Sequence, residues 1–248
     1  KNKKAIMFQF NELPPLVKNI IIINIIFYVA TISLASLGIN LVDYFALHQI
    51  QSSKFYPHQL ITHFFMHGSI SHLFFNMFAL WMFGKTLENI WGPKRFLIYY
   101  FVTALGAALL HILVTQLKIS NLMLEMNISD INTVIENGAN ILQNRQNYIN
   151  SSMSKLNLLI NIPTVGASGA VFGILLAFGL LFPNTLLYIY FAFPIKAKYF
   201  IIIYAIIELY LAILNNPNDN VAHFAHLGGM IFGYILLKYW QKNKTRFY

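Results

Sequence analysis

The chain has 248 residues, of which 57% are hydrophobic and only 10% are charged, and it contains no cysteine. A soluble domain of this length needs far more polar surface, so a soluble fold is excluded and most apolar side chains must face lipid. The absence of cysteine excludes disulfides, thiol nucleophiles and thiolate metal sites. The net charge of +9 does not indicate a nucleic-acid partner, because in a membrane protein the position of the charges matters more than their sum.

Six apolar segments are candidates for membrane-spanning helices, each of which needs about 20 apolar residues. They are residues 17–37, 70–84, 96–117, 166–182, 199–214 and 221–240. We therefore expect an all-α polytopic membrane protein, with a membrane domain over residues 17–240. An even number of spans places both termini on the same side of the membrane.

Basic residues concentrate on the side that holds both predicted termini. That side collects Lys1, Lys3, Lys4, Lys18, Lys85, Lys94, Arg95, Lys196, Lys198, Lys238, Lys242, Lys244 and Arg246, which leaves Lys54, Lys118, Arg145 and Lys155. Loops rich in lysine and arginine stay in the cytoplasm. Residues 1–16 are thus predicted to be a cytoplasmic N-terminal segment without a removable signal peptide, and residues 241–248 a basic cytoplasmic tail.

Two connections between the predicted spans are unusual. Segment 183–198 carries two prolines and a basic end, which predicts a cytoplasmic loop that dips into the membrane interface. Segment 118–162 is polar and rich in asparagine, which predicts an external insertion between the third and fourth spans. Within it an apolar stripe recurs at helical spacing, interrupted by Gly138 and Arg145, and predicts an amphipathic helix lying flat at the outer interface. Its members are Ile131, Ile135, Leu142, Ile149, Met153, Leu156 and Ile160.

The sequence GASGA at 166–170 opens the fourth predicted span and places Ser168 near its outer end. By itself this pattern favours a helix contact in which small residues let two backbones approach closely. On a helical wheel, however, Gly166, Ala170 and Gly173 share one face, whereas Ser168 points nearly opposite. Helix packing therefore explains the glycines and leaves the serine unexplained.

A serine hydroxyl becomes a nucleophile only when a base takes its proton. The sixth predicted span reads VAHFAHLGGMIFG and supplies His226 at a depth similar to that of Ser168. His226 shares a helix face with Gly229 and Gly233, so this face can approach another helix closely. His223 points elsewhere and suits the role of base less well. A single membrane histidine can equally be a structural hydrogen-bonding residue, although ionisable groups inside a membrane are functional candidates by default.

The second predicted span offers hydrogen-bond donors for a developing oxyanion. His72 and Asn76 are four residues apart and stack on one helix face, although such a pair can also be one interhelical hydrogen bond. His63 and His67 are expected to be structural. Glu208 is the only acidic residue within the predicted spans and falls near the middle of the fifth. No acid is therefore expected to orient the base, and the site is predicted to be a Ser-His dyad.

Three motifs, in this order along the chain, make the sequence resemble the rhomboid family of intramembrane serine proteases. They are HGSISHLFFN at 67–76, GASGAVFG at 166–173 and AHLGGMIFG at 225–233. The resemblance covers roughly residues 17–117 and 163–240. It implies a rhomboid-like bundle of six transmembrane helices, with segment 118–162 as an insertion longer than the short third loop of the basic family core.

The resemblance also implies roles for individual residues. Ser168 would be the nucleophile and His226 the general base and acid. The oxyanion donors would be His72, Asn76 and the Ser168 backbone amide, and the supporting residues Phe172, stacked on the base, together with Gly166, Gly169, Gly229 and Gly233. Family members often carry a Trp-Arg pair before the second span, and the matching position here is His58-Gln59.

The implied activity is an intramembrane endopeptidase that hydrolyses a peptide bond in or near the outer part of a substrate's transmembrane helix. Its partners would be transmembrane protein substrates and membrane lipid, it would need no cofactor or metal, and we expect it in a bacterial inner (plasma) membrane. Two alternatives remain. A histidine-based metal or haem protein is suggested by the spacings of His63 with His67 and of His223 with His226, which no carboxylate is expected to join. A non-proteolytic relative that binds membrane clients is the other, although such relatives usually lack the serine or the histidine.

Overall fold

The computed structural model describes residues 13–189, 193–214 and 221–242, so most of the predicted segment 1–16 and of the tail 241–248 lies outside the described residues. The helices before the predicted insertion are α1 (Pro15–Ala35), α2 (Leu41–Phe45), α3 (Gln59–Thr62), η2 (His63–Phe65), α4 (Ile70–Ala79), η3 (Leu80–Gly84), α5 (Lys85–Trp91) and α6 (Pro93–Met123). They are followed by α7 (Ile128–Gln143), α8 (Ser151–Asn161), α9 (Ser168–Leu181), β1 (Leu186–Ile189), β2 (Phe193–Lys196), α10 (Ala197–Leu214) and α11 (His223–Lys242).

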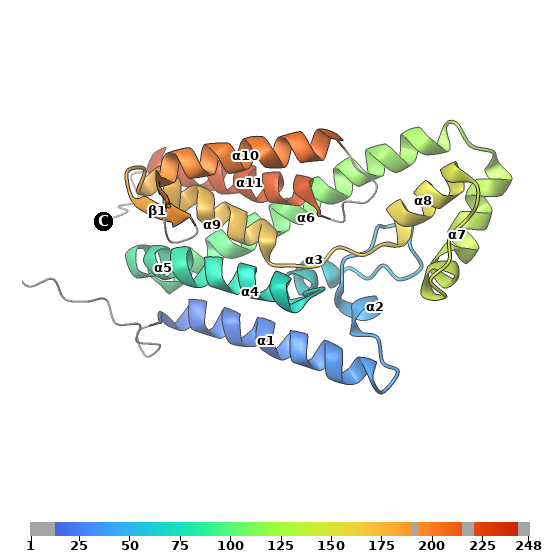
Figure 1. The fold of residues 1–248 in the computed structure, drawn as a ribbon, viewed down its shortest axis with the longest axis horizontal. Coiled ribbons are helices and arrows are strands. Elements are labelled where there is room, and N and C mark those ends of the chain that lie inside the picture. The colour runs from blue at the N-terminus through green and yellow to red at the C-terminus, as the bar shows by residue number, and fades with distance from the viewer. Residues whose placement is uncertain (1–12, 190–192, 215–220, 243–248) are drawn as a thin grey trace, which may run out of the picture.

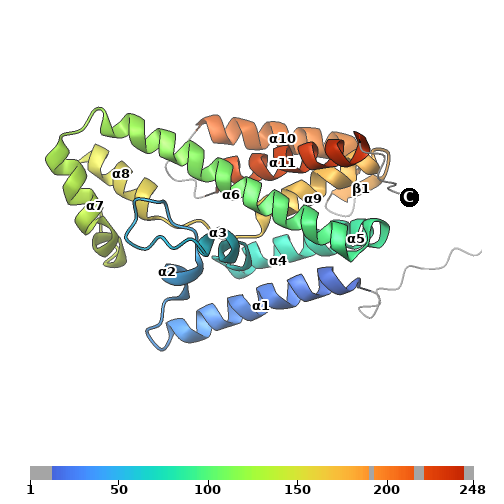
Figure 2. The same ribbon diagram turned by 180° about the vertical axis from the view of Figure 1, so that it is seen from behind.

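The long helices form an elongated bundle with different structures at its two ends. Helices α7 and α8 lie at one end and the β1–β2 hairpin lies at the other (Figure 1). The start of α1 and the end of α11 both lie at the hairpin end. Seen from behind, α6 crosses the bundle from the hairpin end towards α7 (Figure 2).

Three helices of the described chain, α1, α6 and α10, are both long enough and apolar enough to cross a membrane. The structure is therefore that of a helical membrane protein. Helix α9 has 14 residues and spans about 21 Å, which is less than the roughly 30 Å of a hydrocarbon core. Helices α4, η3 and α5 follow one another without a break, so the predicted span 70–84 continues to Trp91 through a π-helical turn.

Helix α9 is the central helix of the bundle. Ten of its 14 residues are buried, whereas α1 buries only Val17, Ile20 and Asn24. Because α1 is apolar on nearly all sides, its exposed isoleucines are suited to lipid contact. Helices α6 and α11 cover the sides of α9 (Figure 2).

A buried carboxylate fixes the start of α1. The Glu88 side chain is 2% exposed, and its two oxygens accept hydrogen bonds from the backbone amides of Leu16, at 3.0 Å, and Val17, at 2.8 Å. The first amides of a helix have no acceptor within the helix, and the positive end of the helix dipole favours a negative charge. Glu88 thus ties α1 to α5.

The predicted insertion differs from the single amphipathic helix expected for it. Helix α6 continues past the predicted boundary at residue 117 to Met123, and the rest forms two helices, α7 and α8. The break between them contains Arg145, whose φ of 57° is incompatible with a right-handed helix. The two helices pack on each other and on α6 through a separate core of Ile119, Val134, Leu156 and Ile160. The prediction was wrong because a periodic stripe does not show whether the backbone turns within it.

The predicted loop 183–198 contains an antiparallel hairpin, so the all-α expectation is wrong for this segment. Strands β1 and β2 pair with Leu186 opposite Lys196 and Ile189 opposite Phe193. Two strands of four residues are too short to give a clear alternating pattern, although the local sequence LLYIYFAF is rich in residues that favour strands.

The first loop is organised by the pair His58-Gln59. Gln59 is fully buried, and its amide nitrogen donates to the backbone oxygens of Lys54, at 2.8 Å, and Asp43, at 3.3 Å, while its oxygen accepts from the amide of His48, at 3.2 Å. The His58 ring nitrogen Nε2 donates to the Tyr44 carbonyl oxygen at 2.7 Å. Gln59 therefore links three parts of the loop, at the position that the resemblance matches to the arginine of the Trp-Arg pair.

Candidate active site

The segment before α9 is held in place by the first loop and by η2. Leu47 and Thr164 exchange two backbone hydrogen bonds, of 2.9 and 2.7 Å, and the Gly166 amide donates to the His63 carbonyl at 3.0 Å. Gly166 has a φ of +121°, a backbone conformation that residues other than glycine rarely adopt. The chain then enters α9 at Ser168, which occupies the first helical position.

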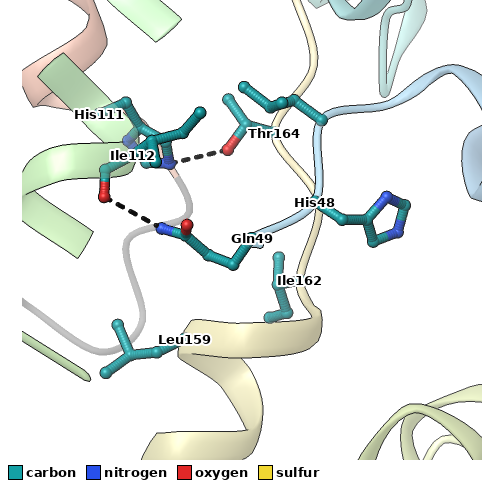
Figure 3. Close-up of a pocket in the computed structure, with 8 residues that line it drawn as sticks. His48, Gln49, His111, Ile112, Leu159, Ile162 and Thr164 are labelled. Carbon is teal, nitrogen blue, oxygen red and sulfur yellow. Dashed lines mark hydrogen bonds between the residues drawn. The ribbon is translucent and has the colours of Figure 1, made fainter. Parts of the chain in front are cut away.

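A small cavity of about 20 Å³ lies behind this segment, with room for about one water molecule (Figure 3). Across it, His111 Nε2 lies 2.9 Å from the Thr164 hydroxyl, and the Gln49 side chain donates to the Ile112 carbonyl at 3.5 Å. None of the predicted site residues lines the cavity. The cavity lies between the first loop, α6 and the segment before α9, so it belongs to the scaffold of the site.

The Ser168 hydroxyl oxygen lies 2.8 Å from Nε2 of His226, which is a hydrogen-bonding distance. The histidine is 8% exposed, and it stands in the first turn of α11. The ring of Phe172 stacks on the His226 ring, with centroids 4.1 Å apart and planes inclined by 8°. Two side chains 58 residues apart in sequence are thus held in contact, with the imidazole fixed on one side by an aromatic face.

Helices α9 and α11 approach backbone to backbone beside this pair. A methyl group added at Gly229 would overlap the Gly169 carbonyl oxygen and lie 2.7 Å from the Gly169 carbonyl carbon. Gly233, one turn further along α11, instead faces the Tyr99 hydroxyl of α6. That hydroxyl donates to the Gly173 carbonyl of α9 at 2.9 Å. The glycines of the two motifs therefore set the distance between the helices that carry the hydroxyl and the imidazole.

The expected oxyanion donors have different contacts in the structure. His72 packs against Gly166, where an added methyl group would lie 2.7 Å from its Cε1 and 2.8 Å from its Nε2. The Asn76 amide donates to the His72 carbonyl oxygen at 3.0 Å, so this bond lies within α4 and does not link two helices. The Ser168 amide is in the first turn of α9, where amides have no acceptor within their own helix.

For the peptidase activity that the resemblance implies, we expect Asn76→Ala to lower the rate of cleavage by about 10² to 10³, the usual cost of removing one oxyanion donor. His72→Ala should fall in the same range if its ring donates directly. The measurement is kcat on a transmembrane reporter peptide. The control is Ser69→Ala, because the Ser69 hydroxyl caps the same helix by accepting from the His72 amide at 3.1 Å. Losses below about threefold for both Asn76 and His72 would mean that the pair only stabilises α4.

The expectation that no acid reaches the base is wrong. Glu208 Oε2 lies 2.8 Å from Nδ1 of His226 and 2.6 Å from Nδ1 of His223. Glu208 is 6% exposed and lies less than two turns before Leu214, the last residue of α10. The depth of an acid along its own span was a poor guide, because α10 packs against α11 and a glutamate side chain is long enough to reach the neighbouring first turn.

The other histidines have separate environments. His63 Nδ1 donates to the Gln59 carbonyl at 2.7 Å, and the His67 ring packs against the His72 ring with centroids 5.0 Å apart.

In the described part of the chain, the group of side chains able to hold a metal ion is Glu208, His223 and His226, whose ligand atoms lie within 4.8 Å of one another. The expectation that no carboxylate joins the histidine pair of α11 is therefore wrong as well.

Comparisons with known proteins agree with the motifs. A family model described as the rhomboid domain matches residues 54–242. The chain is 27% identical over 190 residues to "RHOMBOID-like protein 12, mitochondrial" of Arabidopsis thaliana, covering 77% of this chain and 48% of that protein. It is 25% identical over 186 residues to "Rhomboid protein 1, mitochondrial" of Saccharomyces cerevisiae, covering 73% and 42%. It is 24% identical over 192 residues to "Putative rhomboid protease YdcA" of Bacillus subtilis, covering 77% and 70%.

The chain spans about half the length of the first two relatives. Their names place those two proteins in mitochondria, so they do not support the expected location in a bacterial inner membrane. A membrane location of this chain is supported by its three long apolar helices. The match of the family model extends over the three motifs and over α3 to α11. This chain belongs to the rhomboid family.

Proposed function

We propose that the chain is an intramembrane serine endopeptidase that hydrolyses a peptide bond in or near the outer part of a substrate's transmembrane helix. The observation that carries the proposal is the 2.8 Å contact between the Ser168 hydroxyl and Nε2 of His226. A hydroxyl in contact with the unprotonated nitrogen of an imidazole is the arrangement that activates serine as a nucleophile. Membership of the rhomboid family, whose members are generally serine intramembrane proteases, supports it.

In the proposed reaction, the Ser168 oxygen attacks the scissile carbonyl carbon while its proton passes to Nε2 of His226. His226 then returns that proton to the leaving amine nitrogen as the C–N bond breaks. The charge on the tetrahedral oxygen is stabilised by His72, Asn76 and the Ser168 amide. In the second half of the reaction, water attacks the acyl carbon while His226 takes its proton, and His226 returns that proton to the Ser168 oxygen as the bond between that oxygen and the acyl carbon breaks. These steps need no cofactor.

We also propose a topology of six spans, with α7 and α8 outside the membrane and both termini in the cytoplasm. The basic residues support it. The hairpin end of the bundle contains the starts of α1, α6 and α10, the end of α11, and α5 and β2 (Figure 1). These parts carry Lys18, Lys85, Lys94, Arg95, Lys196, Lys198, Lys238 and Lys242. The hairpin end would then face the cytoplasm. Ser168 begins α9 at the end that points towards α8, so water would reach it from the outside.

Because the chain has no cysteine, this topology can be tested with single introduced thiols. Glu136 in α7 and Lys242 at the end of α11 are both exposed. A membrane-impermeant maleimide should label Glu136→Cys in intact right-side-out vesicles, but should label Lys242→Cys only after the membrane is permeabilised. Equal labelling of both positions in intact vesicles would contradict the proposed topology.

A metal protein remains the second candidate, because Glu208, His223 and His226 are close enough to share an ion. The distances favour hydrogen bonds: the two nitrogen–oxygen separations are 2.6 and 2.8 Å, whereas tetrahedral zinc ligands at about 2.1 Å from the metal lie about 3.4 Å apart.

We expect the purified protein in liposomes to cleave a transmembrane reporter at the same rate with and without a divalent-metal chelator. A fluorophosphonate should also modify the chain at Ser168, as shown by mass spectrometry of the labelled peptide. Loss of cleavage with chelator and its recovery with added zinc would favour the metal protein. Binding of the reporter without cleavage or labelling would favour a client-binding relative.

A further inference from the structure

The geometry around His226 points to a third member of the site. We propose that Glu208 is a positioning residue that holds the His226 ring in its reactive tautomer and stabilises the ring when it becomes charged, so that Ser168, His226 and Glu208 act as a triad. This inference rests on the proposed protease function. It uses an observation that the proposed function does not use, the contact of Glu208 with His226. Glu208 lies in α10, and none of the residues in the three motifs lies in that helix.

The hydrogen bonds determine which nitrogen of His226 carries the proton. A carboxylate only accepts hydrogen bonds, so Nδ1 of His226, 2.8 Å from Glu208 Oε2, must donate. In a neutral imidazole the other nitrogen is then an acceptor. Nε2 therefore presents its lone pair to the Ser168 hydroxyl 2.8 Å away, as a general base must. Without Glu208 the ring could equally adopt the opposite tautomer, which cannot accept the proton of serine.

The charge of Glu208 matters during the reaction as well as before it. When Nε2 takes the proton of Ser168, the His226 ring becomes a cation in a buried place, where the side chains of both His226 and Glu208 are at most 10% exposed. A carboxylate at hydrogen-bonding distance stabilises that cation strongly because little water is present to do so. Glu208 keeps its negative charge throughout and takes no proton, and His226 passes its Nε2 proton on to the leaving amine.

His223 holds the carboxylate in position. Its Nδ1 donates to the same Oε2 at 2.6 Å, from the first residue of α11. With one bond from His223 and one from His226, the Oε2 atom is anchored between the two histidines. Burying a carboxylate is costly unless it accepts hydrogen bonds, and the two histidines supply them here. His223 is thus placed to support Glu208 and not to contact Ser168.

The decisive variant is Glu208→Gln, because glutamine keeps the shape and a hydrogen-bonding oxygen but has no charge. We expect the rate of Ser168 labelling by a fluorophosphonate to fall at least 100-fold, since loss of the negative partner of the base lowers turnover severely in serine hydrolases. For reporter cleavage, kcat should fall by a similar factor and KM should stay within about threefold. Glu208→Asp, which keeps the charge, should be faster than Glu208→Gln.

A matched control is available in Glu88→Gln. Glu88 is an equally buried carboxylate with two hydrogen bonds, but it caps α1. This variant should lower Tm while the labelling rate of the folded protein stays within about threefold. In a Ser168→Ala background, Glu208→Gln should cause no further loss of cleavage, because the two residues act in one step.

The outcomes separate this inference from the proposed function. If Ser168→Ala and His226→Ala are inactive but Glu208→Gln keeps its labelling rate within about threefold, Glu208 only links α10 to α11 and the protease remains. If wild type is not labelled at Ser168, the proposed function itself fails. Bound zinc in equimolar amount in the wild type that is lost in Glu208→Gln would also overturn the triad.

If Glu208→Gln does not fold, the tautomer can be measured in the wild type. In a ¹⁵N-histidine NMR spectrum of the detergent-solubilised protein, neutral His226 should show a protonated Nδ1 and an unprotonated Nε2. Assignment comes from the signal that disappears in His226→Ala. The opposite tautomer would contradict the role of Glu208.

Discussion

Replacing Ser168 by alanine should reduce cleavage of a transmembrane reporter to background, a loss on the order of 10⁶-fold in kcat for a serine hydrolase. The change removes only the oxygen that is 2.8 Å from His226, so the nucleophile is lost and the helix is kept. Alanine also favours a helix, and the residue is the first of α9. The protein should therefore insert and fold as before, with an unchanged Tm and unchanged binding of the reporter.

The matched control is Ser36→Ala at the end of α1, where the serine hydroxyl bonds to the Ser33 carbonyl at 2.6 Å, on a different helix from the proposed site. This variant should cleave the reporter at the wild-type rate. Full activity in Ser168→Ala would end the protease proposal. Loss of activity in both variants, with both folded, would mean that the assay responds to a general effect of alanine substitution.

Replacing Gly229 by valine should abolish activity although every proposed catalytic side chain remains. A methyl group at this position would overlap the Gly169 carbonyl oxygen and lie 2.7 Å from the Gly169 carbonyl carbon, so it meets backbone and not a flexible side chain. Helices α9 and α11 would have to separate. A displacement of about 1 Å between two reacting groups can cost on the order of 10²-fold in rate. We therefore expect at least this loss in fluorophosphonate labelling, together with a lower Tm.

Even Gly229→Ala should be severely impaired, because the overlap begins at the first added carbon. The control is Gly68→Ala: an added methyl group there would have one neighbour within 4 Å, Val165 at 3.9 Å, so wild-type labelling is expected. A wild-type rate in Gly229→Val would show that the backbone contact between the two helices is dispensable.

Hydropathy and motifs in the sequence were sufficient for the class of the protein and its family. Long apolar segments predict membrane helices because backbone groups in lipid must be satisfied within the segment, and the structure has helices at all six predicted places. Glycines at helical spacing predicted the close approach of the His226 face, which is present at Gly229. These features are local in the sequence, so one chain without structure reveals them.

Features that depend on how the backbone turns were harder to predict. The stripe from Ile131 to Ile160 keeps helical spacing on both sides of its interruption at Arg145, yet the chain reverses there and the stripe packs partly on itself. Periodicity reports which side of a helix is apolar but not which surface will cover it. The hairpin of β1 and β2 was missed for a related reason, since four-residue strands carry too few positions to show an alternation.

The sequence by itself determined that this is a helical membrane protein of the rhomboid family, and it singled out Ser168 and His226 as residues to examine together. Only the tertiary structure decided what surrounds them. It places Glu208 of α10, which belongs to none of the three motifs, at Nδ1 of His226, and it places Gln59 at the centre of the first loop. The physical reason is that a hydrogen bond between helices depends on their spacing and rotation, and these are set by packing across the whole bundle.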